Sequence, residues 1–353
     1  MHTTTLLAAA RRRLALTAVA GLFVACGIIG ALPSKAAAAS CEDVSIPVAL
    51  APGQPKNQTI RGTHCTPSSP SIMRSVDVLV PGGTYNSMYW DFPLNNGQYS
   101  YVSRTLQANR ATFNFDRIGT GKSSKPLSAL VTFDAEAYTL HQVIQWLKDN
   151  RGYQDVTSIG HSAGSITAVA EAARYNDVDR LVATGFIHSP GWKLLLDLGA
   201  GGLTPAAIDP QFVGKVLDPG YLTTVDGKRG SAFYSSSADP KVIAYDEAHK
   251  DIISGTSAAV MIAQILVPPL LNESARVKVP VLAVVGDQDV LCNNLLGPDC
   301  SSAASVTTHE KAWFPAAKSY TAKVIPGTGH NLPLHPSADT SFQVIDQWIK
   351  AHD

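Results

Sequence analysis

Short apolar runs rich in β-branched residues alternate along this chain with longer segments of helical periodicity, and this alternation most limits the possible folds. Strands that alternate with helices normally pair in parallel and are covered by the helices on both faces. We therefore predict an α/β fold with a mostly parallel central sheet flanked by helices. The expected strands are 75–80, 111–115, 155–159, 180–187, 279–285 and 320–325, and the expected helices are 134–150, 165–174 and 342–349.

Two regions do not follow the alternation. Residues 190–275 separate the fourth expected strand from the fifth and are too long for a simple crossover. Because 241–253 and 257–271 have helix-like patterns, we interpret this stretch as a helical cap inserted over the sheet, not as an independent domain. Residues 41–73 contain several prolines, so we expect an irregular or short-stranded lead-in there.

The first 39 residues are typical of an export signal. Three consecutive arginines, Arg11 to Arg13, precede an uncharged run from 14 to 32, and a stretch of small residues, 36–39, suits cleavage. Two alternatives stay open: an uncleaved membrane anchor, or a lipidated Cys26 within a partial lipobox. We expect a signal peptide at 1–39 and a secreted domain at 40–353 with no stable membrane span. The alternative location is the outer face of the cell membrane, by a lipid or membrane anchor.

The charge balance changes when the signal is removed. The whole chain has 28 basic and 28 acidic residues, but the first 39 hold four basic residues and no acidic one. The mature chain therefore carries 24 basic against 28 acidic residues, a net charge of −4. A nucleic-acid partner is not expected, because such partners require a basic surface.

The cysteines favour an oxidising compartment. Four would remain after cleavage, and an even number in an exported protein favours disulfides. Three connectivities are possible, of which proximity in the sequence favours Cys41–Cys65 and Cys292–Cys300. No spacing of cysteine and histidine resembles a zinc site, so no metal is predicted.

The motif that carries chemistry is Gly160-His161-Ser162-Ala163-Gly164, which lies between an expected strand and an expected helix. This context is the one that a Gly-x-Ser-x-Gly nucleophile turn requires, because the turn lifts the serine oxygen out of the chain at a helix N-terminus. An ordinary strand-to-helix turn is the alternative. We predict that Ser162 is a nucleophile.

A serine nucleophile needs a base and an acid that orients the base. Two carboxylates, Asp287 and Asp289, follow the strand expected at 279–285, and His330 lies in a glycine-rich loop after the next strand. The order serine, acid, histidine is that of the α/β-hydrolase fold. Over roughly residues 70–350 the chain resembles this family.

The resemblance implies further roles. In the family the acid usually closes a Gly-x-x-Asp turn, which favours Asp289, whereas Asp287 would cap the turn and is the alternative acid. The family's oxyanion hole implies backbone donors at Gly83 and Ala163, although Pro81 stands in place of the family's histidine and leaves Thr84 as a second candidate beside Gly83. No metal or organic cofactor is implied. The segment 116–123 resembles a structural turn of the family and lacks the first glycine of a phosphate loop.

Four further residues are candidates for a substrate pocket: Thr84, Tyr85, His161 and His188. His161 is also expected to pack beside the serine, His141 to be a surface or packing residue, and His309 and His335 are alternative bases in poorer contexts.

The sequence therefore predicts a secreted serine hydrolase that cleaves a carboxylic ester or related acyl bond of a small, apolar acyl substrate. One alternative is an aminopeptidase, which would need a carboxylate such as Asp246, Glu247 or Asp251 to hold the substrate amine. Others are an acyltransferase or lyase on the same fold and a binding protein without catalysis. The oligomeric state is not predictable from these patterns.

Overall fold

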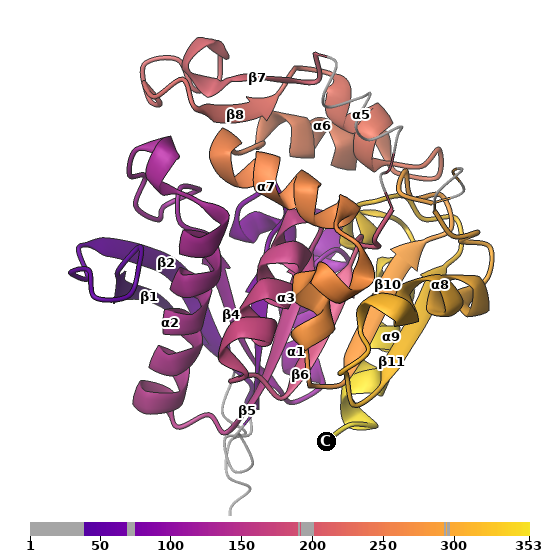
Figure 1. Cartoon of the computed structure of the whole chain (residues 1–353). Coiled ribbons are helices and arrows are strands. Elements are labelled where there is room, and N and C mark those ends of the chain that lie inside the picture. Colours follow the sequence, from indigo (N-terminus) through magenta and orange to yellow (C-terminus); the bar gives the residue numbers. More distant parts are fainter. Residues whose placement is uncertain (1–38, 69–74, 190, 192–200, 293, 295–296) are drawn as a thin grey trace, which may run out of the picture. The chain divides into compact units, whose positions relative to one another are not determined.

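A computed structural model describes residues 39–68, 75–189, 191, 201–292, 294 and 297–353 (Figure 1). The expected export signal up to residue 38, with Cys26, lies outside the described residues, and so does much of 190–200. In the part of the chain that is described, no helix has both the length and the apolar character needed to cross a membrane.

The centre of the fold is an eight-stranded sheet of order β1-β2-β4-β3-β5-β6-β10-β11. Six of its strands are parallel: β3 (Ser75–Val80), β4 (Ala111–Asp116), β5 (Asp155–His161), β6 (Arg180–Thr184), β10 (Val281–Gly286) and β11 (Tyr320–Ile325). The predicted mostly parallel sheet is thus confirmed. The inner strands are buried along their whole length because helices cover both faces, which explains their nearly continuous apolar sequences.

The lead-in at 41–73, expected to be irregular or short-stranded, does form strands, and these are longer than expected. Strands β1 (Ser40–Val48) and β2 (Gln58–Thr66) each have nine residues and extend the sheet in antiparallel pairing. On β1, Val44, Ile46 and Val48 are buried while the residues between them are exposed. Pro47 has no amide hydrogen to donate to a neighbouring strand. It is tolerated because β1 is the edge strand of the sheet, where this missing hydrogen bond costs little.

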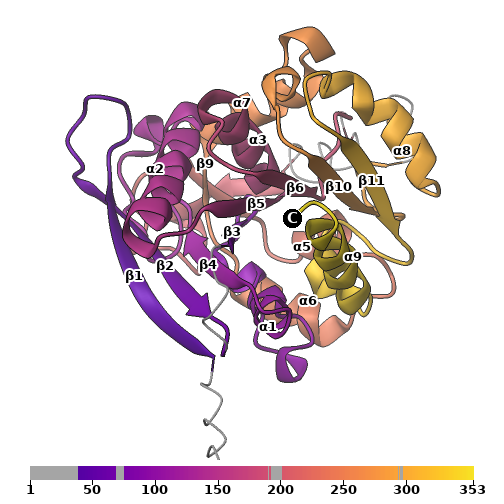
Figure 2. The same cartoon turned by 90° about the horizontal axis from the view of Figure 1, so that it is seen from below.

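Helices pack on both faces of the sheet (Figure 2). On one face lie α2 (Phe133–Arg151) and α3 (Ala163–Tyr175), and on the other α1 (Tyr101–Gln107) and α9 (Ala338–Lys350). The ends of α2 are set by its sequence: the Thr132 hydroxyl accepts from the Ala135 amide at 3.1 Å, and Gly152 ends the helix with a φ of 74°. A further helix, α8 (Ala303–Glu310), packs beside β11.

The insertion between β6 and β10 is not purely helical as expected. It contains a three-stranded antiparallel sheet of order β7-β8-β9 together with three helices (Figure 1). Its strands are too short for their alternation to stand out in the sequence. The elements are β7 (Leu203–Pro205), β8 (Tyr221–Thr224), α5 (Lys228–Phe233), α6 (Pro240–Ala248), β9 (Ile253–Ser254) and α7 (Gly255–Leu266).

Candidate active site

Ser162 is the single residue between the end of β5 and the start of α3. Its φ of 51° lies in the left-handed region, which is strained for a residue with a side chain and recurs at functional turns. The flanking glycines allow the turn, since a Cβ at Gly160 would collide with the backbone of Ser165 and one at Gly164 with the carbonyl oxygen of Val80.

Ser162, His330 and Asp289 form a chain of hydrogen bonds. The Ser162 Oγ lies 2.9 Å from His330 Nε2, and His330 Nδ1 lies 3.0 and 3.1 Å from the two carboxylate oxygens of Asp289. The three residues follow β5, β11 and β10, whose carboxyl ends meet at one edge of the parallel sheet. His330 and Asp289 are 1% and 3% exposed, while Ser162 is partly accessible. This arrangement can transfer a proton from the serine to an oriented imidazole.

The two carboxylates after β10 have different partners. Asp289 faces His330, whereas Asp287 Oδ1 accepts from the Thr328 amide at 3.1 Å. The structure therefore brings Asp289, and not Asp287, into contact with the histidine, and Asp287 holds the loop that leads to His330.

The glycines after β3 lie against the nucleophile turn. A Cβ at Gly82 would lie 3.4 Å from the Ser162 Cβ, and one at Gly83 would lie 3.6 Å from the Ala163 Cβ. Within the described part of the chain, the backbone amides of Gly83, Thr84 and Ala163 donate to no protein acceptor. Such amides beside a serine can receive a developing oxyanion, and the choice between Gly83 and Thr84 stays a prediction.

The side chains of Thr84 and Tyr85 belong to a buried polar cluster. We call this group the Arg229 cluster; it consists of Thr84, Tyr85, Arg229, Tyr234, Asp246 and Asn331. Arg229 of α5 makes a bidentate ion pair with Asp246 of α6, at 2.9 and 3.0 Å, and donates to the Thr84 hydroxyl at 2.9 Å.

The Arg229 cluster connects the insertion to both catalytic loops. The hydroxyl of Tyr85 donates to Asp246 at 3.0 Å and accepts from the Asn331 side chain, next to His330, at 2.5 Å. Tyr234 donates to the same carboxylate at 2.8 Å. Burial is the main cause that raises the pKa of Tyr85 well above its usual range; the charge of Arg229 opposes this shift and the charge of Asp246 adds to it. The hydroxyl therefore stays protonated and can donate.

Sequence reasoning missed Arg229 because its role depends on contacts between distant segments. It considered Asp246 and Asp251 only as carboxylates for a substrate amine. Asp246 is fully engaged in the cluster, and Asp251 accepts from the Asn86 side chain at 2.8 Å and the Gly121 amide at 3.0 Å. Both carboxylates are therefore occupied by protein donors.

His161 packs beneath the serine and does not face a pocket. Its ring is fully buried, stacks on Tyr89 at 4.3 Å between centroids and lies 4.9 Å from the His330 ring. Burial, and then the nearby His330, lowers the pKa of His161 well below its usual range, so its imidazole is neutral.

His188, a candidate for the substrate pocket, is buried, and its place in such a pocket stays a prediction. Its Nδ1 lies 2.7 Å from Glu310 of α8, its Nε2 lies 2.9 Å from the Ser274 hydroxyl, and its ring stacks on Trp313. Although burial alone would raise the pKa of Glu310, the charge and hydrogen bonds of His188 hold that pKa below its usual value. His188 thus anchors α8 to the end of β6.

Both cysteine pairs favoured by the sequence are at disulfide distance. Cys41 and Cys65 lie opposite each other on β1 and β2, and Cys292 is joined to Cys300 in the loop after β10. The amide of Cys292 donates to the main-chain oxygen of Asp289 at 2.9 Å, so the second disulfide begins one turn from the acid.

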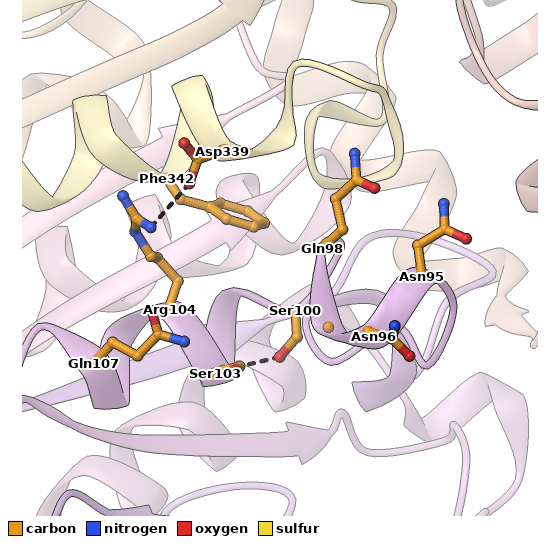
Figure 3. Close-up of a pocket in the computed structure, with 10 residues that line it drawn as sticks. Asn95, Asn96, Gln98, Ser100, Ser103, Arg104, Gln107, Asp339 and Phe342 are labelled. Atoms are coloured by element: carbon orange, nitrogen blue, oxygen red, sulfur yellow. Dashed lines mark hydrogen bonds and ion pairs between the residues drawn. The ribbon is translucent and has the colours of Figure 1, made fainter.

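Two cavities lie near these elements. One of about 520 Å³ is lined by Tyr234 and Ser235 of the insertion and by Asp289, Val290 and Cys292. A second, of about 340 Å³, is polar, lies between residues 95–107 and α9, and contains no triad residue (Figure 3). The first cavity therefore adjoins the catalytic acid, and the second is separate from it.

The chain was compared with models of protein families and with known proteins. A sequence model described as "Alpha/beta hydrolase family" matches residues 78–341. In sequence, none of the curated proteins matches the chain.

Solved structures share the fold at low identity. A monoacylglycerol lipase from Paleococcus ferrophilus is 18% identical, with a TM-score of 0.50 over 89% of this chain and 100% of that one. Est1E from Butyrivibrio proteoclasticus, solved with ferulic acid, is 16% identical, with a TM-score of 0.51 over 84% of this chain and 96% of that one. The esterase domain of a Rhodothermus marinus protein is 14% identical, with a TM-score of 0.51 over 88% and 97%.

Proposed function

Because the chain belongs to the alpha/beta hydrolase family, we propose that it is a secreted serine hydrolase that cleaves a carboxylic ester of a small-molecule, apolar acyl substrate. The observation that carries this proposal is the hydrogen-bond chain from Ser162 through His330 to Asp289, in which the atoms that must exchange a proton lie 2.9 Å apart. The names of the structural relatives, a lipase and esterases, agree with an ester substrate, although at these identities they establish the fold alone.

In the proposed reaction the Ser162 Oγ attacks the substrate carbonyl while His330 Nε2 takes its proton. Asp289 holds the Nδ1–H of His330 and stabilises the imidazolium. The amides of Gly83 and Ala163 donate to the oxyanion, which stabilises the transition state by about 3–4 kcal/mol per donor. His330 then gives its proton to the leaving alcohol. A water, activated by the same histidine, cleaves the acyl-enzyme to release the acid and free Ser162.

Hydrolysis of esters is preferred to removal of N-terminal amino acids. An aminopeptidase needs a free carboxylate to hold the substrate amine. Of the three carboxylates considered for this role, Asp246 and Asp251 are already bound by buried protein donors, which leaves Glu247 as the candidate. Secretion is supported by the export signal in the sequence and by the two disulfides, since such bonds persist in oxidising compartments.

A fluorophosphonate probe tests the proposed chemistry. We expect the probe to label Ser162 in the native protein and to leave the Ser162→Ala variant unlabelled. p-Nitrophenyl esters of increasing chain length, compared with aminoacyl anilides, then separate an esterase from a peptidase. Folded protein that reacts with neither the probe nor any ester would contradict the proposal and favour a binding protein.

A further inference from the structure

Three side chains that can bind a metal ion meet between α2 and α3, away from the proposed catalytic residues. His141 lies on α2, Glu171 on α3, and Asp177 two residues beyond the end of α3. One ligand atom of each residue lies within 4.8 Å of one ligand atom of the other two. We call these three residues the His141 cluster.

Glu171 is the unusual member of the His141 cluster. Its side chain is 0% exposed, and it contacts the carboxyl group of Asp177, but no N–H group among the described residues donates to either of its carboxylate oxygens. The His141 Nδ1 lies 4.0 Å from Oε1 of Glu171. One Asp177 oxygen, Oδ1, is buried in the same unpartnered state. Buried carboxylate oxygens are normally paired, so these atoms require an explanation.

A proton shared between the two carboxyl groups explains only part of this arrangement. Such a proton forms one hydrogen bond from one Glu171 oxygen and leaves the other oxygen unpaired. The neighbouring lysine does not supply the missing charge, because Lys148 Nζ donates to the main-chain oxygen of Asp177 and not to a carboxylate. A divalent cation, in contrast, balances two carboxylates and can bind both oxygens of Glu171.

The surroundings hold the other two side chains in place. The Nδ1 of His141 lies 2.7 Å from Asp177 Oδ2, and its ring stacks on Tyr175 at 4.0 Å between centroids. The Gln145 amide donates to the same Asp177 oxygen at 2.7 Å, as outer hydrogen bonds do for metal ligands. His141 is 23% exposed, which gives an ion a way in from solvent.

We propose that His141, Glu171 and Asp177 bind a divalent transition-metal ion, with Zn²⁺ as the best fit. One imidazole nitrogen and two carboxylates, with water in the remaining position, suit Zn²⁺, whereas Ca²⁺ and Mg²⁺ prefer oxygen ligands throughout. The ion would join α2 to the end of α3 and would stabilise the fold without taking part in catalysis.

The test uses untagged protein freed of metal with EDTA and titrated with ZnCl₂. We expect one ion to bind per chain by calorimetry, and the unfolding midpoint to rise by about 4 °C when free Zn²⁺ exceeds Kd a hundredfold. The His141→Ala and Asp177→Asn variants should each weaken binding by at least about 100-fold. The matched control is His249→Ala, which removes an exposed histidine that likewise stacks on a tyrosine, Tyr245, and should leave binding unchanged.

Three results would overturn the proposal. The first is the absence of saturable Zn²⁺ binding to the native protein. The second is an equal loss of affinity in His141→Ala and His249→Ala. The third is a native protein whose stability does not change with Zn²⁺, together with a Glu171→Gln variant that is more stable than the native protein. That result would show that a shared proton, and not a metal ion, stabilises the His141 cluster. None of these measurements uses enzymatic activity, so their outcome does not depend on whether the proposed ester hydrolysis is correct.

Discussion

At the scale of single residues, two carboxylates two positions apart have separate tasks. Because only Asp289 contacts His330, we predict that Asp289→Asn lowers kcat for an ester about 10³–10⁴-fold, through the wrong imidazole tautomer. Asp287→Asn, the matched control, should lower kcat less than about tenfold, because the lost contact with the Thr328 amide affects the position of His330 only indirectly. Similar losses in the two variants, at equal thermal stability, would refute the assignment of the acid.

A second residue-scale prediction concerns His335. Its Nε2 accepts from the amides of Ser235 and Gly329, both at 3.1 Å, and its Nδ1 donates to the Asn331 carbonyl oxygen at 2.7 Å, so the ring must be neutral. Burial is the main cause that lowers the pKa of His335 below its unfolded value of about 6.5. Below that pH the unfolded chain binds more protons than the folded chain, and stability falls as the pH falls toward the folded pKa.

We therefore expect the unfolding midpoint to decrease from pH 7.5 to pH 5, and to decrease less steeply in His335→Gln, which cannot be protonated. The decrease should not vanish, because burial also lowers the pKa of His161 and His64. Thermal scans across this range measure both slopes. Equal slopes in the two proteins would show that His335 does not contribute.

Residues with a role set by local sequence were the easiest to predict. Ser162 and His330 stand in glycine-containing turns directly after strands, where a side chain can project only from the sheet edge. The side chains of Thr84, Tyr85 and His188 also follow strands, but their partners are Arg229, Asp246 and Glu310, far away in the sequence. Burial among such partners is decided by packing of the whole chain, so these contacts could not be predicted from the local sequence.

At the scale of elements, the loop after β10 holds both the proposed catalytic acid and a disulfide. The Cys292–Cys300 disulfide begins one turn beyond Asp289, so we predict that the double variant Cys292→Ser/Cys300→Ser loses activity at temperatures where it is still folded. The matched control is Cys41→Ser/Cys65→Ser, which opens the pair on β1 and β2 and should lower the unfolding midpoint with little change in kcat below it. Activity and circular dichroism recorded on the same samples separate the two effects. Unchanged activity in the first variant would disprove the link.

Helices α5 and α6 of the insertion are tied to the core through the Arg229 cluster. We predict that Asp246→Asn destabilises the protein by about 3–5 kcal/mol, because it leaves the Arg229 charge buried without its partner. The control is Asp226→Asn, whose carboxylate is 69% exposed and pairs with Lys250; its cost should stay below about 1 kcal/mol. Denaturant unfolding measures both values. A loss below about 1 kcal/mol for Asp246→Asn would show that the cluster is not held by this charge.

The elements were predicted where their pattern was long. The helix at 134–150 and the six parallel strands were found within a few residues of their ends, because each is a continuous amphipathic or apolar run. Strands β1 and β2 were missed since prolines before, between and after them suggested irregular chain. Strands β7 to β9 have two to four residues each, which is too short for any period to be recognised.

For the whole molecule, the alternation of strands and helices decided the fold, and the fold gathered the candidate site. Ser162, Asp289 and His330 are far apart in sequence, but the carboxyl ends of β5, β10 and β11 bring them to one edge. The sequence could therefore predict that these three residues lie near one another, although it could not predict their individual hydrogen bonds. It could not predict what the insertion does, because the insertion acts through a buried ion pair that has no sequence motif.

The Arg229 cluster also limits how this enzyme can be altered by exchange of parts. Specificity in capped hydrolases is an attractive target for grafting, in which one cap replaces another on an unchanged catalytic core. Here Thr84 and Tyr85 belong to the core, while their partners Arg229 and Asp246 belong to the insertion. A foreign cap without those partners would leave the side chains of Thr84 and Tyr85 without these hydrogen bonds beside the proposed nucleophile. A successful chimera must therefore transfer both halves of the cluster together.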